Sequence, residues 1–210
     1  MISEVKADES GEVIFKKSNH YNQNGKIDSL SFEMLDSFKV RNKSVFKYNE
    51  EEKVVTKTTL NKDTKEIKDI SISYFDNKDN VVKTIRKNKE GKIVKHIERK
   101  FDEKNNEIES KDFSINGAVG KKTIRKFDSN SLLLNSKEFN HNDELVREIT
   151  NKYNSYLDVI NSKSFTANFN QNSLTKHEYK YDENNNWIEL KYYLFDKLTT
   201  FSKRQIEYFE

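Results

Sequence analysis

The sequence predicts an all-β protein, an antiparallel meander of about 14–16 strands built from repeats of 26–28 residues. Three observations predict it. First, an aromatic residue, usually followed by Asp or Asn, recurs along the chain. Second, two further positions at fixed distances after this residue are apolar in most repeats, and third, no helical periodicity persists for three turns. The aromatic anchors are Tyr21, Tyr48, Phe75, Phe101, Phe127, Tyr153, Tyr181 and Tyr208. Their successive spacings of 27, 27, 26, 26, 26, 28 and 27 residues are too regular for chance.

The two apolar columns lie seven and twelve residues after each anchor. The first contains Val55, Val82, Ile108, Leu134, Ile160 and Ile188, and the second contains Leu60, Phe113, Phe139, Phe165 and Tyr193. Asp28 interrupts the first column, and Glu33 and Lys87 interrupt the second. Each repeat therefore has four registered positions, the aromatic residue, its Asp or Asn, and the two apolar sites.

Each repeat is predicted to contain two strands and two turns. In one repeat, residues 93–101 form the first strand, 102–106 a turn, 107–113 the second strand, and 114–117 another turn. Asp and Asn favour turns because their side chains bond to nearby main chain, so Asp102 is expected to cap its turn. Asn116-Gly117 predicts a type I′ turn. Strands joined this tightly are antiparallel neighbours.

The predicted sheet is thin, an extended single layer or a curled one. Lys95 and Arg99 share one face with Ile93, Ile97 and Phe101, and a thick sandwich would bury those cations. Only 33% of residues are hydrophobic and 35% are charged, a balance typical of disorder. Aromatic residues at 12% and a net charge of only +3 favour a folded chain instead.

The whole chain is expected to form one β-repeat domain. Residues 1–20 are predicted to be an N-terminal cap strand, 21–180 the repeats, and 181–210 a C-terminal repeat or cap. The absence of proline fits an uninterrupted hydrogen-bonded ladder, because proline has no N–H to donate.

No residues form a recognisable catalytic, cofactor or metal site, so we expect the protein not to be an enzyme. The histidines, His20, His96, His141 and His177, lie in four different repeats without metal-ligand spacing. The acids Asp76, Asp102, Asp128 and Asp182 occupy equivalent turn positions rather than one close pair. Cysteine is absent, as are phosphate-binding glycine loops and nucleophile motifs.

A candidate binding patch consists of Trp187, Tyr192 and Tyr193, because exposed aromatic rings stack on sugars or anchor protein partners. The alternative is that Trp187 caps the last repeat, and the atypical character of terminal repeats favours this. A protein or glycan partner is expected. Nucleic acid is not, because 38 basic residues are interspersed with 35 acidic ones. No segment is apolar enough to span a membrane, and we expect a monomer or a weak edge-to-edge dimer.

The C-terminal segment carries a family resemblance. Tyr181-Asp182-Glu183-Asn184-Asn185-Asn186-Trp187-Ile188, followed by Arg204-Gln205-Ile206-Glu207-Tyr208, resembles the terminal unit of exported Bacteroidetes proteins related to the RHS/YD-repeat family. Asn185 stands where that unit usually has glycine. Close resemblance covers about thirty residues. It implies an extended β-repeat protein, often of the cell envelope or associated with toxin delivery, and no particular catalytic residues.

Two functions remain open. The first is a non-enzymatic binding surface or spacer in the bacterial envelope or outside the cell. The second is a cytoplasmic interaction protein, such as an immunity or chaperone-like partner of a polymorphic toxin. The first six residues contain no signal-peptide core, so a periplasmic, surface or secreted location is favoured if a leader was removed, and a cytoplasmic one otherwise.

Overall fold

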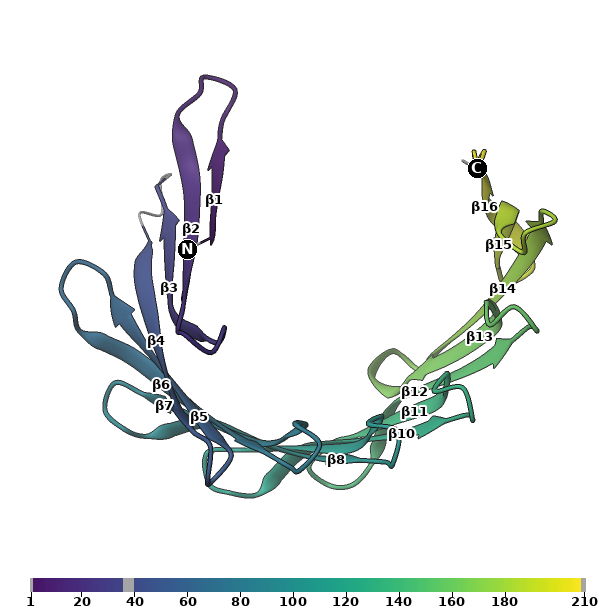
Figure 1. The fold of residues 1–210 in the computed structure, drawn as a ribbon. Helices are drawn as coiled ribbons and strands as arrows, with labels where there is room; N and C mark the ends of the chain where they lie inside the picture. The colour runs from purple at the N-terminus through teal and green to yellow at the C-terminus, as the bar shows by residue number, and fades with distance from the viewer. Residues whose placement is uncertain (1, 36–39, 209–210) are drawn as a thin grey trace. The chain divides into compact units, whose positions relative to one another are not determined.

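The computed structural model describes residues 2–35 and 40–208 and confirms the all-β fold. Its 16 strands form an antiparallel meander, and each strand follows the previous one in chain order (Figure 1). The strand count lies within the predicted range. The chain divides into two compact units, Met1–Arg99 with Asp112–Ala118, and Lys100–Lys111 with Val119–Glu210, called unit 1 and unit 2 below.

The strands are mostly seven to nine residues long. The first eight are β1 (Ile2–Ala7), β2 (Val13–Tyr21), β3 (Ile27–Met34), β4 (Arg41–Asn49), β5 (Val54–Asn61), β6 (Ile67–Phe75), β7 (Val81–Asn88) and β8 (Ile93–Phe101). The others are β9 (Glu107–Phe113), β10 (Val119–Phe127), β11 (Leu133–Phe139), β12 (Leu145–Tyr153), β13 (Val159–Thr166), β14 (Gln171–Tyr181), β15 (Trp187–Leu194) and β16 (Lys197–Lys203), with a short 3₁₀ helix, η1, at Ala167–Phe169. The predicted strands at 93–101 and 107–113 have these same limits.

One turn motif recurs through the sheet. In the turn after β8, Asp102 Oδ1 accepts hydrogen bonds from the main-chain N–H of Lys104 and Asn106, both at 2.9 Å. The Asn105 N–H donates to the Asp102 carbonyl at 3.2 Å, and Asn105 has a positive φ of 65°. This is a three-residue loop, a turn followed by a left-handed residue. The same pair of side-chain bonds occurs in the turns that begin at Asp8, Asn22, Asp76, Asp128, Asn140, Asn154 and Asp182.

The prediction that the aspartates cap turns is therefore confirmed, but the type I′ turn predicted at Asn116-Gly117 is wrong. Gly117 has a φ of 84°, whereas Asn116 is not in the positive-φ region that a type I′ turn requires. The Gly117 N–H donates to the Ser114 carbonyl at 2.9 Å, so this loop repeats the three-residue form. The same motif at Asp8 also places β1 and most of β2 within 1–20, where a single cap strand was predicted.

The fourth residue of each such turn adopts a left-handed backbone, and at Leu157 this is strained. Leu157 has a φ of 68° and is exposed, so its side chain contributes little packing in return. We expect Leu157→Gly to raise the free energy of unfolding by about 0.5–1 kcal/mol. Urea denaturation measures this. Leu157→Ala keeps the Cβ that causes the strain, so an equal gain in that variant would contradict the explanation.

Each unit is a single layer of sheet. Among the described residues no hydrophobic side chain is buried, and the buried residues are the polar Glu33, Ser44 and Thr123. Pairing is antiparallel from β1 to β8 in unit 1 and from β10 to β16 in unit 2. The predicted thin sheet is confirmed. Its stability comes from the hydrogen-bonded ladder and from half-buried cross-strand pairs rather than from a core.

Candidate functional site

The aromatic anchors occupy equivalent places at the ends of alternate strands. Seven of them end or nearly end β2, β4, β6, β8, β10, β12 and β14, and Tyr208 follows β16. The hydroxyls of four anchors bind the preceding repeat, and that of Tyr208 donates to Asp182 Oδ2 at 2.6 Å. Tyr48 donates to the Ile27 carbonyl at 2.7 Å, Tyr153 to the Leu133 carbonyl at 2.9 Å, and Tyr181 to Asp158 Oδ2 at 2.6 Å. These contacts give the anchors a structural role, since they fasten one repeat to the next.

The predicted patch residues do not share one surface. Tyr192 lies opposite His177 in the β14–β15 register and Tyr193 lies opposite Lys176, so the two tyrosines point to opposite faces. The Tyr193 hydroxyl donates to Glu178 Oε2 at 2.9 Å. The Arg204 guanidinium lies 3.9 Å from the centre of the Trp187 ring and donates through Nε to the Trp187 carbonyl. Trp187 is thus covered by the segment after β16, an arrangement that fits a cap.

An aromatic row lies on the face of unit 2 that bears Tyr192, here called the tyrosine face. Ring centres are 5.1 Å apart for Tyr192–His177, 6.3 Å for His177–Tyr179, 5.9 Å for Tyr179–Tyr181 and 4.0 Å for Tyr181–Tyr156. The last two pairs are stacked. Stacking occupies ring faces of Tyr156, Tyr179 and Tyr181 that a sugar would otherwise use.

His177 is the one histidine of this row. Its Nδ1 atom is buried without a hydrogen-bond partner, and burial lowers the pKa of the imidazole below its ordinary value. The side chain is therefore neutral near neutral pH. Within the described ranges, no group of three His, Cys, Asp or Glu side chains is arranged to hold a metal ion.

The tip of the β15–β16 hairpin carries a strained aromatic residue. Phe195 and Asp196 have φ values of 48° and 62°, the paired left-handed conformation of a type I′ turn. Left-handed backbone is unfavourable for a bulky side chain, yet Phe195 is 56% exposed and so is not compensated by burial. Such strain is concentrated at functional sites. The Phe195 N–H donates to the Leu174 carbonyl at 2.9 Å, which fixes the tip against β14.

A groove of about 480 Å³ adjoins this tip, and Phe195 lines it. The other lining residues are Glu148, Thr150, Lys163, Ser164, Phe165, Asn172, Ser173 and Leu174. Phe165, Leu174 and Phe195 supply apolar contact, and Lys163 and Glu148 supply charges of opposite sign. On the neighbouring β16, Leu198 and Phe201 are about half exposed, at 49% and 48%. β16 is also the last strand in the sheet order.

Phe195 and the groove beside it were not predicted from the sequence. The sequence patch was chosen by aromatic residue type alone, without regard to backbone conformation. Phe195 and Asp196 separate two strand segments by two residues, a spacing that signals a tight hairpin. That spacing requires positive φ at the turn and could have marked Phe195 as strained.

A second groove lies in unit 1, with a volume of about 350 Å³ and a lining that includes Tyr48, Val55 and Phe75. Two of the charged residues that line it, Lys26 and Glu50, are paired with each other. Lys26 Nζ lies 2.5 Å from Glu50 Oε1, and this hydrogen bond raises the pKa of the lysine. Internal pairing makes this groove a weaker candidate than the one beside Phe195. In the part of the chain that is described, no helix is long and apolar enough to cross a membrane.

No family model matches the sequence, and no curated protein matches it. Among solved structures, the chain is similar to a porin-like protein from Bacteroides uniformis ATCC 8492, with 9% identity, 90% of each chain covered and a TM-score of 0.49. It is also similar to part of TcdB2-TccC3-Cdc42, with 9% identity, 93% of this chain and 15% of that chain covered, and a TM-score of 0.36. The similarity to TcdB2-TccC3 has 10% identity, covers 87% of this chain and 12% of that chain, and gives a TM-score of 0.39. All three TM-scores are below 0.5, and the similarities say nothing about what this chain binds.

Proposed function

We propose that this chain is a non-enzymatic β-repeat protein that binds a protein partner through its C-terminal end, the hairpin β15–β16 and the groove beside it. The observation that carries the proposal is Phe195, an exposed aromatic residue in left-handed conformation at the edge of a partly apolar groove. Aromatic side chains seated in pockets are the usual anchors of protein interfaces.

The neighbouring strand supports a protein rather than a glycan as the partner. That strand is β16, which pairs with β15 next to the groove, and exposed apolar side chains on it suit a protein partner. Leu198 and Phe201 present apolar side chains from that strand. The stacked rings of the tyrosine face leave few ring faces for a sugar. Protein binding is compatible with both functions that the sequence left open, a binding surface in the envelope or outside the cell and a cytoplasmic partner of a toxin. The identity of the bound protein distinguishes the two.

The absence of enzymatic activity is part of the same proposal. The acids at Asp76, Asp102, Asp128 and Asp182 accept main-chain hydrogen bonds through Oδ1, which ties each carboxylate to its own turn rather than to a shared site. A single-layer sheet also offers little enclosed volume from which water is excluded.

The test compares Phe195→Gly with wild type. Crosslinking capture from the native organism identifies a partner, and titration calorimetry with that purified partner gives the affinity. We expect Phe195→Gly to weaken binding by at least about tenfold, the scale of a hot-spot residue. Glycine tolerates positive φ, so this variant should be at least as stable as wild type, and unfolding cannot explain the loss.

Phe169→Ser is the matched control, because Phe169 is 76% exposed and does not line the groove. It should bind the partner like wild type. Equal binding by Phe195→Gly and wild type would place the interface elsewhere and overturn the proposal. Turnover of a small-molecule substrate by the pure chain would overturn its non-enzymatic part.

A further inference from the structure

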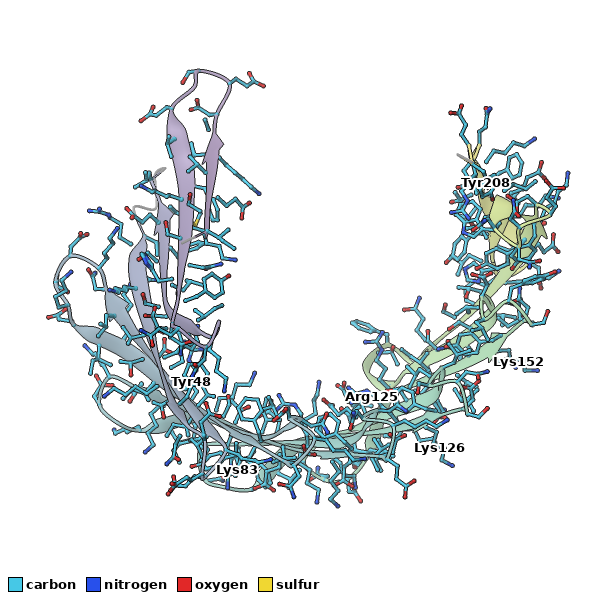
Figure 2. All side chains as sticks on the ribbon, viewed as in Figure 1. Tyr48, Lys83, Arg125, Lys126, Lys152 and Tyr208 are labelled. Atoms are coloured by element: carbon cyan, nitrogen blue, oxygen red, sulfur yellow. The ribbon has the colours of Figure 1, made fainter. Side chains whose placement is uncertain are left out.

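Two loops of unit 1 contain the dipeptide Asn-Gly, at Asn24-Gly25 and at Asn116-Gly117. Both are three-residue loops whose glycines have positive φ, 73° and 84°. The glycine N–H groups donate to the carbonyls of Asn22 and Ser114, at 3.0 and 2.9 Å. Figure 2 shows side chains projecting from both sides of one layer of strands within each unit, and both dipeptides are exposed to solvent. The two loops are thus closely matched in backbone and exposure.

The side-chain hydrogen bonds of the loop 22–26 follow the common turn motif. Asn22 Oδ1 accepts hydrogen bonds from the main-chain N–H of Asn24 at 3.0 Å and of Lys26 at 2.9 Å. The side chain of Asn24 forms no hydrogen bond to a described residue. Its amide oxygen is therefore solvated by water alone within the part of the chain that is described.

The loop 114–118 reverses this arrangement, because its first residue is serine. Asn116 Oδ1 accepts the main-chain N–H of Ala118 at 3.1 Å and lies 2.5 Å from the hydroxyl of Ser114. The hydroxyl has one hydrogen to donate and also lies 2.9 Å from the Ala118 carbonyl, so it is shared between two acceptors. The amide oxygen of Asn116 thus faces two donors of its own loop, whereas that of Asn24 faces none.

This difference concerns a reaction that asparagine undergoes before glycine. The glycine nitrogen loses its proton to hydroxide and forms a bond to the asparagine Cγ. The Cγ–Nδ2 bond then breaks, Nδ2 takes a proton from water and leaves as ammonia, and a five-membered succinimide remains. Water opens the ring at one of its two carbonyls and gives aspartate or isoaspartate, with no oxidation or reduction. Glycine favours the reaction because its backbone is flexible and no side chain hinders its nitrogen.

We propose that Asn116 is a site of spontaneous deamidation, and that the Ser114 hydroxyl and the Ala118 N–H accelerate its reaction relative to Asn24. Attack on Cγ converts the amide oxygen into an oxyanion. Donors that already point at this oxygen bind it more strongly once it is charged, so they stabilise the transition state more than the starting amide. The product carries an added negative charge, and its isoaspartate form lengthens the main chain of the loop by one carbon.

The experiment incubates the full chain at mildly alkaline pH and follows both sites by peptide mass spectrometry, with an isoaspartate-specific methyltransferase to label the isomer. We expect Asn116 to react at least about fivefold faster than Asn24, a smaller factor than enzyme oxyanion donors give, since the loop is exposed to water. The chain unfolded in urea is the control, and there the two rates should be similar. Equal rates in the folded chain, slower reaction at Asn116, or the same ratio in urea would overturn the proposal.

A reciprocal substitution tests the donors themselves. Ser114→Asn restores the acceptor of the common motif, which should release the Asn116 oxygen and slow its reaction by about fivefold. Asn22→Ser should speed the reaction of Asn24. Ser10→Ala is the matched control, because it removes an exposed hydroxyl from a turn without Asn-Gly, and it should change neither rate. Circular dichroism checks that the variants keep the sheet, and an unchanged rate at Asn116 in Ser114→Asn would refute the role of the serine.

Discussion

Replacement of Glu33 by glutamine is expected to lower the free energy of unfolding by about 2–3 kcal/mol near neutral pH. Glu33 is one of the buried polar residues, and its carboxylate accepts a hydrogen bond from Arg41 Nε at 3.0 Å and another from Lys62 Nζ. Glutamine leaves two cations facing a neutral amide. Arg41 and Lys62 are partly exposed and regain some hydration, so the cost falls below that of a fully buried ion pair.

The same group gives a pH dependence. The hydrogen bonds from Lys62 and Arg41 lower the pKa of Glu33 from its ordinary value of 4.5. Its stabilisation is therefore present above the unfolded-state pKa and is lost as pH falls through the lower folded-state pKa. Urea denaturation at a series of pH values measures both effects. Glu33→Gln should flatten the acid limb of the stability curve, whereas the exposed control Glu51→Gln should leave it unchanged. A steep acid limb in Glu33→Gln would refute this account.

Replacement of Tyr181 by phenylalanine is expected to cost about 1.5–3 kcal/mol, the range for hydrogen bonds to charged groups. The Tyr181 hydroxyl donates to Asp158 Oδ2 at 2.6 Å and accepts from Asn154 Nδ2 at 2.7 Å, both in the turn of the preceding repeat. Tyr156→Phe is the control, because the Tyr156 ring stacks on Tyr181 while its hydroxyl makes no hydrogen bond to a described residue. Chemical denaturation should separate the two variants, and equal stability would contradict the role of the hydroxyl.

Alkaline pH tests the same contact. Burial, followed by the hydrogen bond to Asp158, raises the pKa of Tyr181 from 10.0 to about 12. Because the folded state favours the protonated phenol, its stabilisation is complete below pH 10 and is lost as pH rises through about 12. Wild type should lose stability in this window more steeply than Tyr181→Phe, and parallel curves would contradict the shift.

The periodic features of this protein could be predicted from its sequence. The anchors, the strands 93–101 and 107–113, and the role of Asp102 recur often enough to be aligned. The turn at Asn116-Gly117 could not be assigned correctly, because Gly117 serves equally well as the left-handed residue of a longer loop. The sequence also did not show that tyrosine anchors differ from phenylalanine anchors. The tyrosine hydroxyls bond to partners in the preceding repeat that only the strand register brings close.

The candidate sites were harder to predict from the sequence than the fold was. Tyr192 and Tyr193 looked like one patch, although neighbouring residues in a strand point to opposite faces. Charges that alternate along the chain looked evenly mixed. In β12, however, strand alternation puts Lys152 on the opposite face from Arg147, and the register then aligns Lys152, through Asn161, with Lys176 of the next repeat. Strain at Phe195 depends on its φ, which is a property of the hairpin rather than of the residue.

The turn motif beginning at Asp102 or Asn140 closes a hairpin with bonds confined to five consecutive residues. Extensive contacts within each unit likewise join strands that are consecutive along the chain. Folding can therefore nucleate at any hairpin and spread by addition of neighbours, as in other quasi-one-dimensional proteins. Gene duplication could lengthen or shorten such a chain by whole repeats without redesign of a central core, so its length is open to selection independently of its fold.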